Sequence, residues 1–231
     1  MVRKGFSPEE LVIETDAAPL EAILALPSEC RSLVLFAHGA GSSRHSPRNR
    51  YVAGKLNEVG FGTVLMDLLT ADEERIDANT GKLRFDIPLL AGRLDSATEW
   101  VLSDRRTAGL DIGYFGASTG AAAALVAAVQ RPQIVKAVVS RGGRPDLAVR
   151  ILPEVEAPVL LLVGGKDRIV LDMNTEAAKS LHTTCELIVV PGASHLFEEP
   201  GTLAAVANHA TAWFRRYMAV APTHAAHVER R

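Results

Sequence analysis

The sequence has few cysteines, few aromatic residues and almost no excess of charge of either sign. Its two cysteines, Cys30 and Cys185, form neither a CxxC motif nor any other metal-ligand spacing, so we expect free thiols and no metal site. The formal net charge of −2 disfavours a dedicated nucleic-acid-binding protein, which is usually basic. Aromatic residues make up only 5%, which disfavours a wide aromatic pocket for long acyl chains.

Long apolar runs are also missing. No segment approaches the roughly 18 apolar residues of a membrane span, and the charged first ten residues do not resemble a signal peptide. We therefore expect a cytoplasmic protein with no membrane partner.

The composition that is present suits one globular unit. Of the 231 residues, 48% are hydrophobic and 23% are charged, which is close to the average for soluble proteins. This length favours one large domain over two small ones, and we expect it to span residues 1–220. The small, charged segment 221–231 is predicted to be a disordered tail. A monomer and a homodimer are both compatible with the sequence.

Short apolar runs alternate with segments of helical periodicity along most of the chain, which favours a mostly parallel sheet with helices on both faces. Two β-like runs without a helix between them open the sequence and predict an antiparallel edge. The predicted strands are Leu11–Glu14, Leu20–Leu26, Ser32–Ala37, Thr63–Leu69, Ile112–Phe115, Val135–Val139, Pro158–Val163 and Leu187–Val190, and the predicted helices are Arg50–Val59, Asp86–Ser103, Thr119–Gln130, Asp146–Leu152, Leu171–Leu181 and Leu203–Met218.

The residues that follow each strand are the first candidates for chemistry, because ligands of open α/β sheets bind outside the carboxyl ends of the strands. Gly116–Gly120 is a G-x-S-x-G motif that lies between a predicted strand and a predicted helix. This context predicts a sharp turn that exposes the Ser118 hydroxyl above the sheet. The alternative is a glycine-rich turn with an incidental serine.

A serine hydroxyl needs a positioned base at neutral pH, and histidine is the usual one. Of the seven histidines, only His195 directly follows a late strand, so we predict that it is the base for Ser118. The acid that orients the base is expected between the two in the sequence. Asp167 follows a strand and two glycines and is the preferred candidate, and Asp172 is its main competitor as a helix-start residue.

Acyl transfer also needs donors for a negative oxygen, and the loss of one donor costs about 3–4 kcal/mol of barrier. The backbone N–H groups of Thr119, which follows the serine, and Ala40, which lies in the loop after Ser32–Ala37, are the predicted donors. His38 is expected to brace that loop. A simple glycine-rich turn is the alternative for this segment.

Taken in order and after these strands, His38-Gly39, Gly116–Gly120, Asp167 and Gly192–His195 resemble the α/β-hydrolase family. The resemblance covers nearly the whole chain, and the compact size is most similar to the dienelactone hydrolase-like branch, which acts on small esters or lactones. Dienelactone hydrolases proper have a cysteine nucleophile, so the serine here is similar instead to carboxylesterases. The resemblance implies an α/β-hydrolase fold, a mostly parallel sheet of about eight strands with helices on both faces, and no large lid domain.

The resemblance implies a serine hydrolase that cleaves a small carboxylic ester or lactone through an acyl-Ser118 intermediate, without a cofactor. An acyltransferase or a small-peptide hydrolase could use the same three residues. A non-catalytic binding domain on this scaffold is the third interpretation, since a fold does not fix a function.

Basic residues follow two of the strands that border the predicted site. His38, Arg44, Arg48, Arg141 and Arg144 are therefore candidate substrate-binding residues, and arginine matches carboxylate and phosphate geometry. The hypothesis is a small-molecule substrate that carries one of these anions. The alternative, that the arginines are solvated or pair with nearby carboxylates, stays open at this point.

Overall fold

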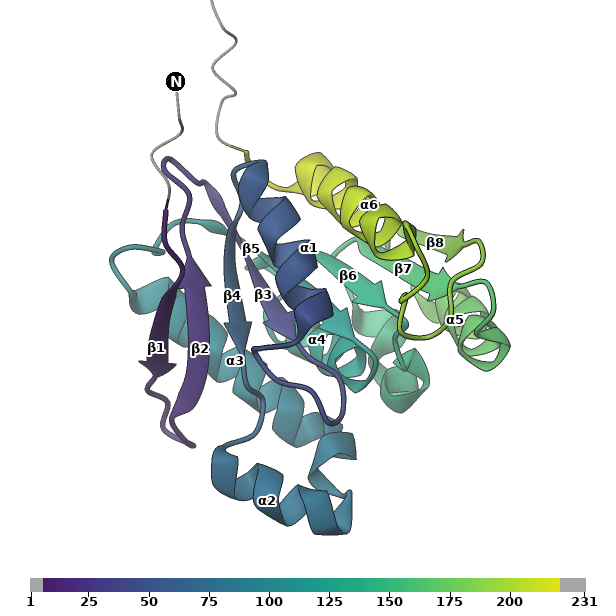
Figure 1. Ribbon diagram of the computed structural model, residues 1–231, viewed down its shortest axis with the longest axis horizontal. Helices are drawn as coiled ribbons and strands as arrows, with labels where there is room; N and C mark the ends of the chain where they lie inside the picture. Colours follow the sequence, from purple (N-terminus) through teal and green to yellow (C-terminus); the bar gives the residue numbers. More distant parts are fainter. Residues whose placement is uncertain (1–5, 221–231) are drawn as a thin grey trace, which may run out of the picture.

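The computed structural model describes residues 6–220, which form an eight-stranded sheet in the order β1-β2-β4-β3-β5-β6-β7-β8 (Figure 1). The pairs β1–β2 and β2–β4 are antiparallel, and every other pair is parallel. The strands are β1 Glu9–Ile13, β2 Leu20–Ala25, β3 Ser32–Ala37, β4 Gly62–Met66, β5 Asp111–Ala117, β6 Val135–Arg141, β7 Val159–Gly164 and β8 Cys185–Val190. The predicted antiparallel edge and the mostly parallel sheet are both confirmed. Segment 221–231, predicted to be a disordered tail, lies outside the described residues.

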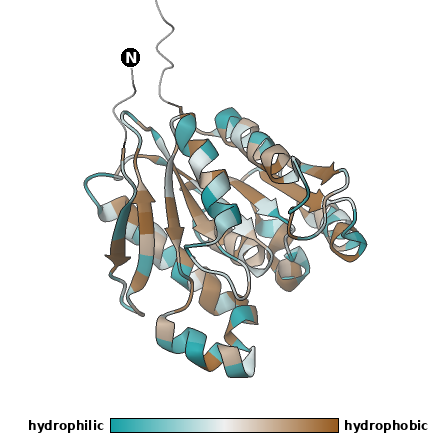
Figure 2. Cartoon of the chain, viewed as in Figure 1, coloured by the Kyte–Doolittle hydropathy of each residue, from teal (hydrophilic) through white to brown (hydrophobic). Residues whose placement is uncertain are grey.

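Helices cover both faces of the sheet. On one face lie α1 Pro47–Glu58 and α6 Thr202–Tyr217, which pack on a core that includes Val52 and Phe214. On the other face lie α3 Ile87–Ser103, α4 Thr119–Gln130, the 3₁₀ segment η2 Pro145–Glu154, and α5 Arg168–Ser180. Figure 2 shows mostly brown, apolar strands between helices on which teal, white and brown residues alternate.

The central strands are apolar on both faces because they are covered on both sides. All six residues of β3 and of β7 are buried, as a parallel strand between two helical layers requires. Helix α4 has four consecutive alanines, 121–124, with no exposed surface, so this helix packs closely against the strands that carry the predicted site.

Two elements were not predicted: α2 Ala71–Thr80 and the 3₁₀ turn η1 Leu83–Phe85. Only Asp77 of α2 is buried, so this helix has no apolar stripe to reveal it. Its ends nevertheless follow a known pattern: Thr70 and Glu73 form a capping box, and Gly81 ends the helix in a left-handed conformation. Within residues 6–220, no helix is both long enough and apolar enough to cross a membrane.

Candidate active site

Ser118 lies in a strained turn between β5 and α4. Its backbone has φ 51° and ψ −121°, a region that non-glycine residues rarely adopt. A Cβ at Gly116 would lie closer than 3.0 Å to the backbone of Ala121, and one at Gly120 would lie that close to the Ala37 carbonyl oxygen. The two glycines therefore let helix, strand and neighbouring loop converge on the serine, as the G-x-S-x-G motif predicts.

The structure brings His195 and Asp167 together. The Nδ1 atom of His195 lies 2.6 Å from Oδ2 of Asp167, although the residues are 28 positions apart. The Asp167 side chain is 15% exposed and the His195 side chain is 40% exposed. The carboxylate thus fixes one ring nitrogen and leaves the other for a proton transfer, while Asp172 lies further along, within α5.

The loop that carries His195 is held by hydrogen bonds to residues that were not predicted from the sequence. The Glu199 carboxylate accepts hydrogen bonds from the Ser194 N–H at 3.0 and 3.1 Å, and these bonds lower the pKa of Glu199. The Lys166 N–H donates to the Ala193 carbonyl at 2.9 Å, so the turn before Asp167 and the histidine loop are fixed to each other.

The imidazole lies beside the serine turn. The Ser118 N–H donates to the Arg141 carbonyl at 3.2 Å, and a Cβ on the next residue, Gly142, would lie 3.5 Å from Nδ1 and from Cε1 of His195. Within residues 6–220 the Ser118 hydroxyl forms no hydrogen bond to His195. In free enzymes such bonds are often long and shorten when substrate binds.

The two predicted oxyanion donors face one cavity. Ala40, in the loop after β3, and Thr119, the first residue of α4, both line it. The loop is held against the serine turn, because a Cβ on Gly39 would lie 2.9 Å from Cβ of Ser118. An N–H in the first turn of a helix has no partner within the helix, so the Thr119 N–H is available to a substrate oxygen.

His38 holds this loop in place through hydrogen bonds from its imidazole ring. Its Nε2 accepts from the Leu68 N–H at 3.0 Å, and its Nδ1 lies 2.9 Å from the Gly39 carbonyl oxygen, to which it donates. Burial lowers the pKa of His38, which agrees with a neutral ring in this pattern. Although His38 lines the cavity, both of its ring nitrogens are engaged by the protein, which fits the predicted bracing role better than substrate binding.

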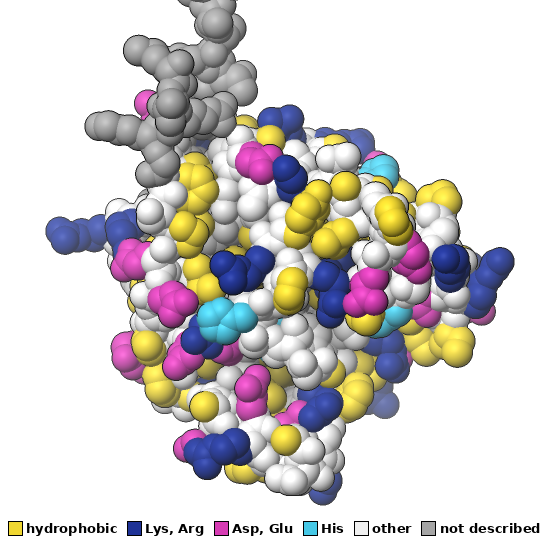
Figure 3. Space-filling model, viewed as in Figure 1, with side chains coloured by type: hydrophobic (Ala, Val, Ile, Leu, Met, Phe, Trp, Pro, Cys, Tyr) yellow, Lys and Arg dark blue, Asp and Glu magenta, His cyan; other side chains and the backbone are white. Residues whose placement is uncertain are grey.

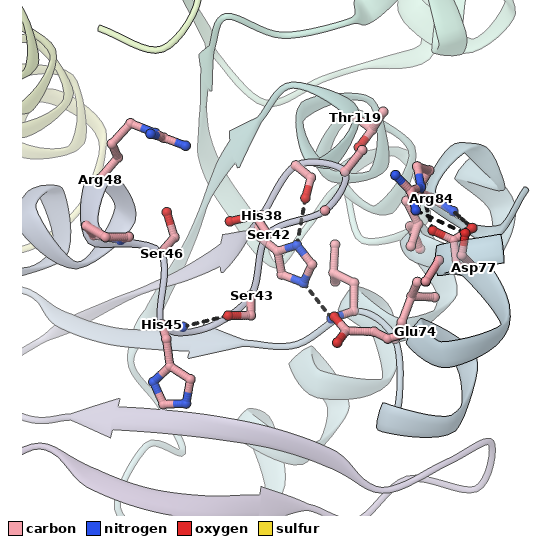
Figure 4. A pocket seen from close by; sticks show the side chains of 18 residues that line it. His38, Ser42, Ser43, His45, Ser46, Arg48, Glu74, Asp77, Arg84 and Thr119 are labelled. Carbon is pink, nitrogen blue, oxygen red and sulfur yellow. Dashed lines mark hydrogen bonds and ion pairs between the residues drawn. The ribbon is translucent and has the colours of Figure 1, made fainter. Parts of the chain in front are cut away.

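The cavity has a volume of about 530 Å³, within the usual range for small-molecule sites. Figure 4 shows that polar side chains from the loop after β3 and from the α2 segment face it from opposite sides. Leucines 68, 69 and 90 add an apolar wall. The α2 contribution was not predicted from sequence: Glu74, Asp77 and Ala78 line the cavity, together with Arg84.

The cavity side of α2 is charged. Asp77 is 3% exposed and is held by Arg84 through a 2.6 Å ion pair from Nε to Oδ2. Partial burial raises the pKa of Glu74, with the nearby Asp67 carboxylate acting in the same direction. Within the described part of the chain, no three His, Cys, Asp or Glu side chains gather into a metal site.

The predicted substrate-binding arginines divide into two groups. Arg44 pairs with Glu21 and Asp67, and Arg144 forms two hydrogen bonds of 2.7 and 2.8 Å to Asp146. Both guanidinium groups are already paired, so the structure favours the alternative of carboxylate pairing for these two.

Arg48 and Arg141 differ from that group. Arg48 lines the cavity, and its only ion pair within residues 6–220 is a 3.3 Å contact with the exposed carboxylate of Glu198. Arg141 does not line the cavity, but it is 8% exposed and forms no ion pair within the same range. These two arginines remain candidates for substrate binding.

Comparison with known proteins agrees with this geometry. Residues 20–221 match the dienelactone hydrolase family. A crystal structure of a dienelactone hydrolase from Anabaena variabilis is 53% identical, with a TM-score of 0.91, and the match covers 93% of this chain and 99% of that one. Est1E from Butyrivibrio proteoclasticus shares the fold with a TM-score of 0.76 at 16% identity, over 90% of this chain and 98% of that one.

Two curated relatives from strains of Mycobacterium tuberculosis are 55% identical over 206 residues, which is 89% of this chain. Each is named "Putative phosphoribosyl transferase", and the chain spans about half the length (46%) of these relatives. The match over residues 20–221 contains the serine turn, the Asp167–His195 pair and the loop after β3. On the strength of the family match and the close structural similarity, this chain belongs to the dienelactone hydrolase family and is a hydrolase of the α/β-hydrolase fold.

Proposed function

We propose that the protein is a serine carboxylesterase or lactonase that cleaves a small ester through an acyl-Ser118 intermediate. The observation that carries the proposal is the 2.6 Å contact between His195 and Asp167 beside a serine held at φ 51°. A strained serine at the end of a central strand, next to an oriented imidazole, is suited to nucleophilic attack.

In the proposed reaction, Ser118 Oγ attacks the ester carbonyl carbon while His195 Nε2 accepts the hydroxyl proton. The carbonyl oxygen becomes negative and is stabilised by the N–H groups of Ala40 and Thr119. Collapse of the tetrahedral intermediate breaks the bond to the leaving oxygen, which takes the proton from His195. Water then attacks the acyl-enzyme in the same way, which releases the acid and restores the serine.

The environment of each group supports its proposed role. Asp167 accepts the Nδ1 proton of His195, which leaves Nε2 free to act as base and stabilises the imidazolium when it forms. The short connection between β6 and β7 holds only η2, so no lid domain covers the site there. The 530 Å³ cavity is lined by the proposed oxyanion residues Ala40 and Thr119 rather than by the triad side chains, and its size suits a small substrate.

The name of the mycobacterial relatives describes a different reaction, in proteins about twice as long as this chain. We propose hydrolysis for this chain because the family match contains all the groups that ester cleavage needs. Release of pyrophosphate from phosphoribosyl pyrophosphate by this chain would overturn that choice.

The direct test combines labelling and turnover. Wild type, Ser118→Ala and the control Ser103→Ala, an exposed residue at the end of α3, are incubated with a fluorophosphonate probe and with 4-nitrophenyl acetate and butyrate. We expect one label per chain and turnover in wild type and control, and neither in Ser118→Ala. Labelling or turnover that persists in a folded Ser118→Ala variant would refute the assignment of the nucleophile.

A further inference from the structure

Arg141 is a buried guanidinium without a carboxylate. It ends β6, the residue is 8% exposed, and its Nη1 atom is buried without a hydrogen-bond partner among residues 6–220. Burial, and then the positive charge of Arg48, lower its pKa to about 10, so the group is still charged at pH 7. A buried charge without a partner is costly, which indicates that a partner of opposite charge is supplied from outside the chain.

The second arginine, Arg48, lies at a cavity that an anionic partner can enter. Arg48 lines the cavity that Ala40 and Thr119 also border, and its Nε atom is buried without a partner within the described range. Its one carboxylate, Glu198, is 64% exposed and 3.3 Å away. Such an exposed pair contributes little, so most of the Arg48 charge is unneutralised.

The position of Arg48 within α1 also favours a bound anion. It lies in the first turn of the helix, which has no acidic residue. The helix dipole disfavours a cation there and favours an anion. Arg141 belongs to the side of the sheet that α1 covers, because Ala137 and Val139, at alternate positions of the same strand, pack in the core beneath α1 and α6.

The backbone of Arg141 lies beside the candidate reacting groups. The Arg141 carbonyl accepts the Ser118 N–H, and Gly142, the next residue, packs against the ring of His195. Figure 3 shows basic and acidic side chains interspersed over the face viewed, without a large field of one sign. Selection of an anion would therefore depend on this local pair rather than on long-range attraction.

We propose that Arg48 and Arg141 form a subsite for a phosphate monoester group of the substrate, next to Ser118. This inference rests on the proposed ester hydrolysis and narrows its substrate class to acyl esters of phosphorylated alcohols. Two guanidinium groups match the charge of nearly two and the three acceptor oxygens of a phosphate monoester at neutral pH. A single carboxylate would neutralise only one of them.

Three acetate esters test the subsite. 2-Acetoxyethyl phosphate, 3-acetoxypropionate and 2-methoxyethyl acetate carry phosphate, carboxylate and no charge at similar distances from the scissile bond, and acetate release is measured for each at pH 7.5. We expect kcat/KM for the phosphate ester to exceed that for the neutral ester by about ten- to a hundredfold, the range expected of hydrogen bonds to a charged group. The difference should lie in KM, because the phosphate is remote from the reacting carbonyl.

The variants are Arg141→Met and Arg48→Met, which keep much of the apolar stem, and Arg150→Met as the control. Arg150 is exposed and follows the same strand as Arg141. We expect Arg141→Met to remove the preference for phosphate, Arg48→Met to reduce it, and Arg150→Met to retain it. Circular dichroism checks that each variant folds, and Arg48→Met decides the question if Arg141→Met does not fold.

Binding of inorganic phosphate to the wild-type protein, measured by titration calorimetry, separates this inference from the proposed function. Phosphate binding that Arg141→Met or Arg48→Met abolishes supports the subsite even if no ester is hydrolysed. Ser118-dependent hydrolysis of all three esters at equal kcat/KM would overturn the subsite and leave the esterase proposal intact. Equal or better hydrolysis of 3-acetoxypropionate would overturn the assignment to phosphate.

Discussion

Gly120 is the position where one added methyl group should separate the two halves of the proposed oxyanion site. A Cβ there would lie closer than 3.0 Å to the carbonyl oxygens of both Ala37 and His38. These are backbone atoms at the end of β3, so no side-chain rotation can relieve the contact. The Gly120→Ala variant must instead move the loop after β3 away from α4.

We expect Gly120→Ala to lose about 3 kcal/mol of unfolding free energy, the upper end of the usual cost of overpacking, because both opposing atoms are backbone. The same movement would displace the Ala40 N–H from its proposed place beside the substrate oxygen. Loss of one such donor lowers kcat by roughly 10²–10³-fold, and we expect a decrease of that order.

Gly92→Ala is the matched control. Gly92 is an exposed residue of α3, and a Cβ there would meet nothing within 4 Å. Alanine in a helix interior is favoured over glycine by roughly 0.5–1 kcal/mol, so this variant should be slightly more stable than wild type. Urea unfolding gives both free energies, and 4-nitrophenyl butyrate gives the activity. A Gly120→Ala variant with wild-type stability and activity would refute the close approach on which this reasoning rests.

Three further changes have defined outcomes. Asp167→Asn should lower kcat by roughly 10³–10⁴-fold while the protein stays folded, since an amide can hold the wrong tautomer of His195, and a loss below tenfold would contradict the role. Because burial lowers the pKa of His38 in the folded state, the unfolded chain binds more protons, so unfolding free energy should fall as pH drops below about 6.5, the unfolded value. In urea titrations between pH 8 and 5, the unfolding free energy of His38→Gln should fall less steeply with pH than that of wild type. An identical slope in the two proteins would show that His38 is not the source of this pH dependence. Tyr114→Phe removes the 2.7 Å hydrogen bond to the buried Thr98 hydroxyl and should cost about 1 kcal/mol in the same assay, whereas a loss above about 3 kcal/mol would show that more than this bond is affected.

The candidate triad was predicted from local pattern together with the general topology of a parallel sheet. Ser118, Asp167 and His195 each follow an apolar run, and the carboxyl ends of parallel strands meet at one edge of a sheet. The contact between Asp167 and His195 in the structure agrees with that reasoning.

The wall of the cavity could not be predicted in the same way. Helix α2 buries only Asp77, so apolar periodicity, the main signal used, is absent there. The capping box formed by Thr70 and Glu73 was the available signal, and it marks where a helix starts without showing which cavity the helix will face.

Whether each arginine is paired also depended on features that sequence alone does not show. Arg44 meets Glu21 from β2 and Asp67 from the end of β4, both more than twenty positions away. Arg144 meets Asp146, a near neighbour whose role as partner rather than helix-start residue depends on the path of η2. Sequence could name the arginines near the site, but it could not separate the paired ones from Arg141.

The sheet order has a consequence for how activity is lost. The proposed nucleophile, Ser118, directly follows β5 at the centre of the sheet, whereas the proposed base, His195, follows β8, an edge strand whose residues are mostly half-buried or exposed. Edge segments open locally at lower free energy than the central strands of a domain. Opening of β8 alone would move His195 away and leave Ser118 in place. Heating should therefore abolish activity reversibly at a temperature below that of global unfolding. The thermal limit of catalysis would then be set by the fraying of one peripheral strand, and strengthening that edge would extend the working range of the enzyme without altering the reacting groups.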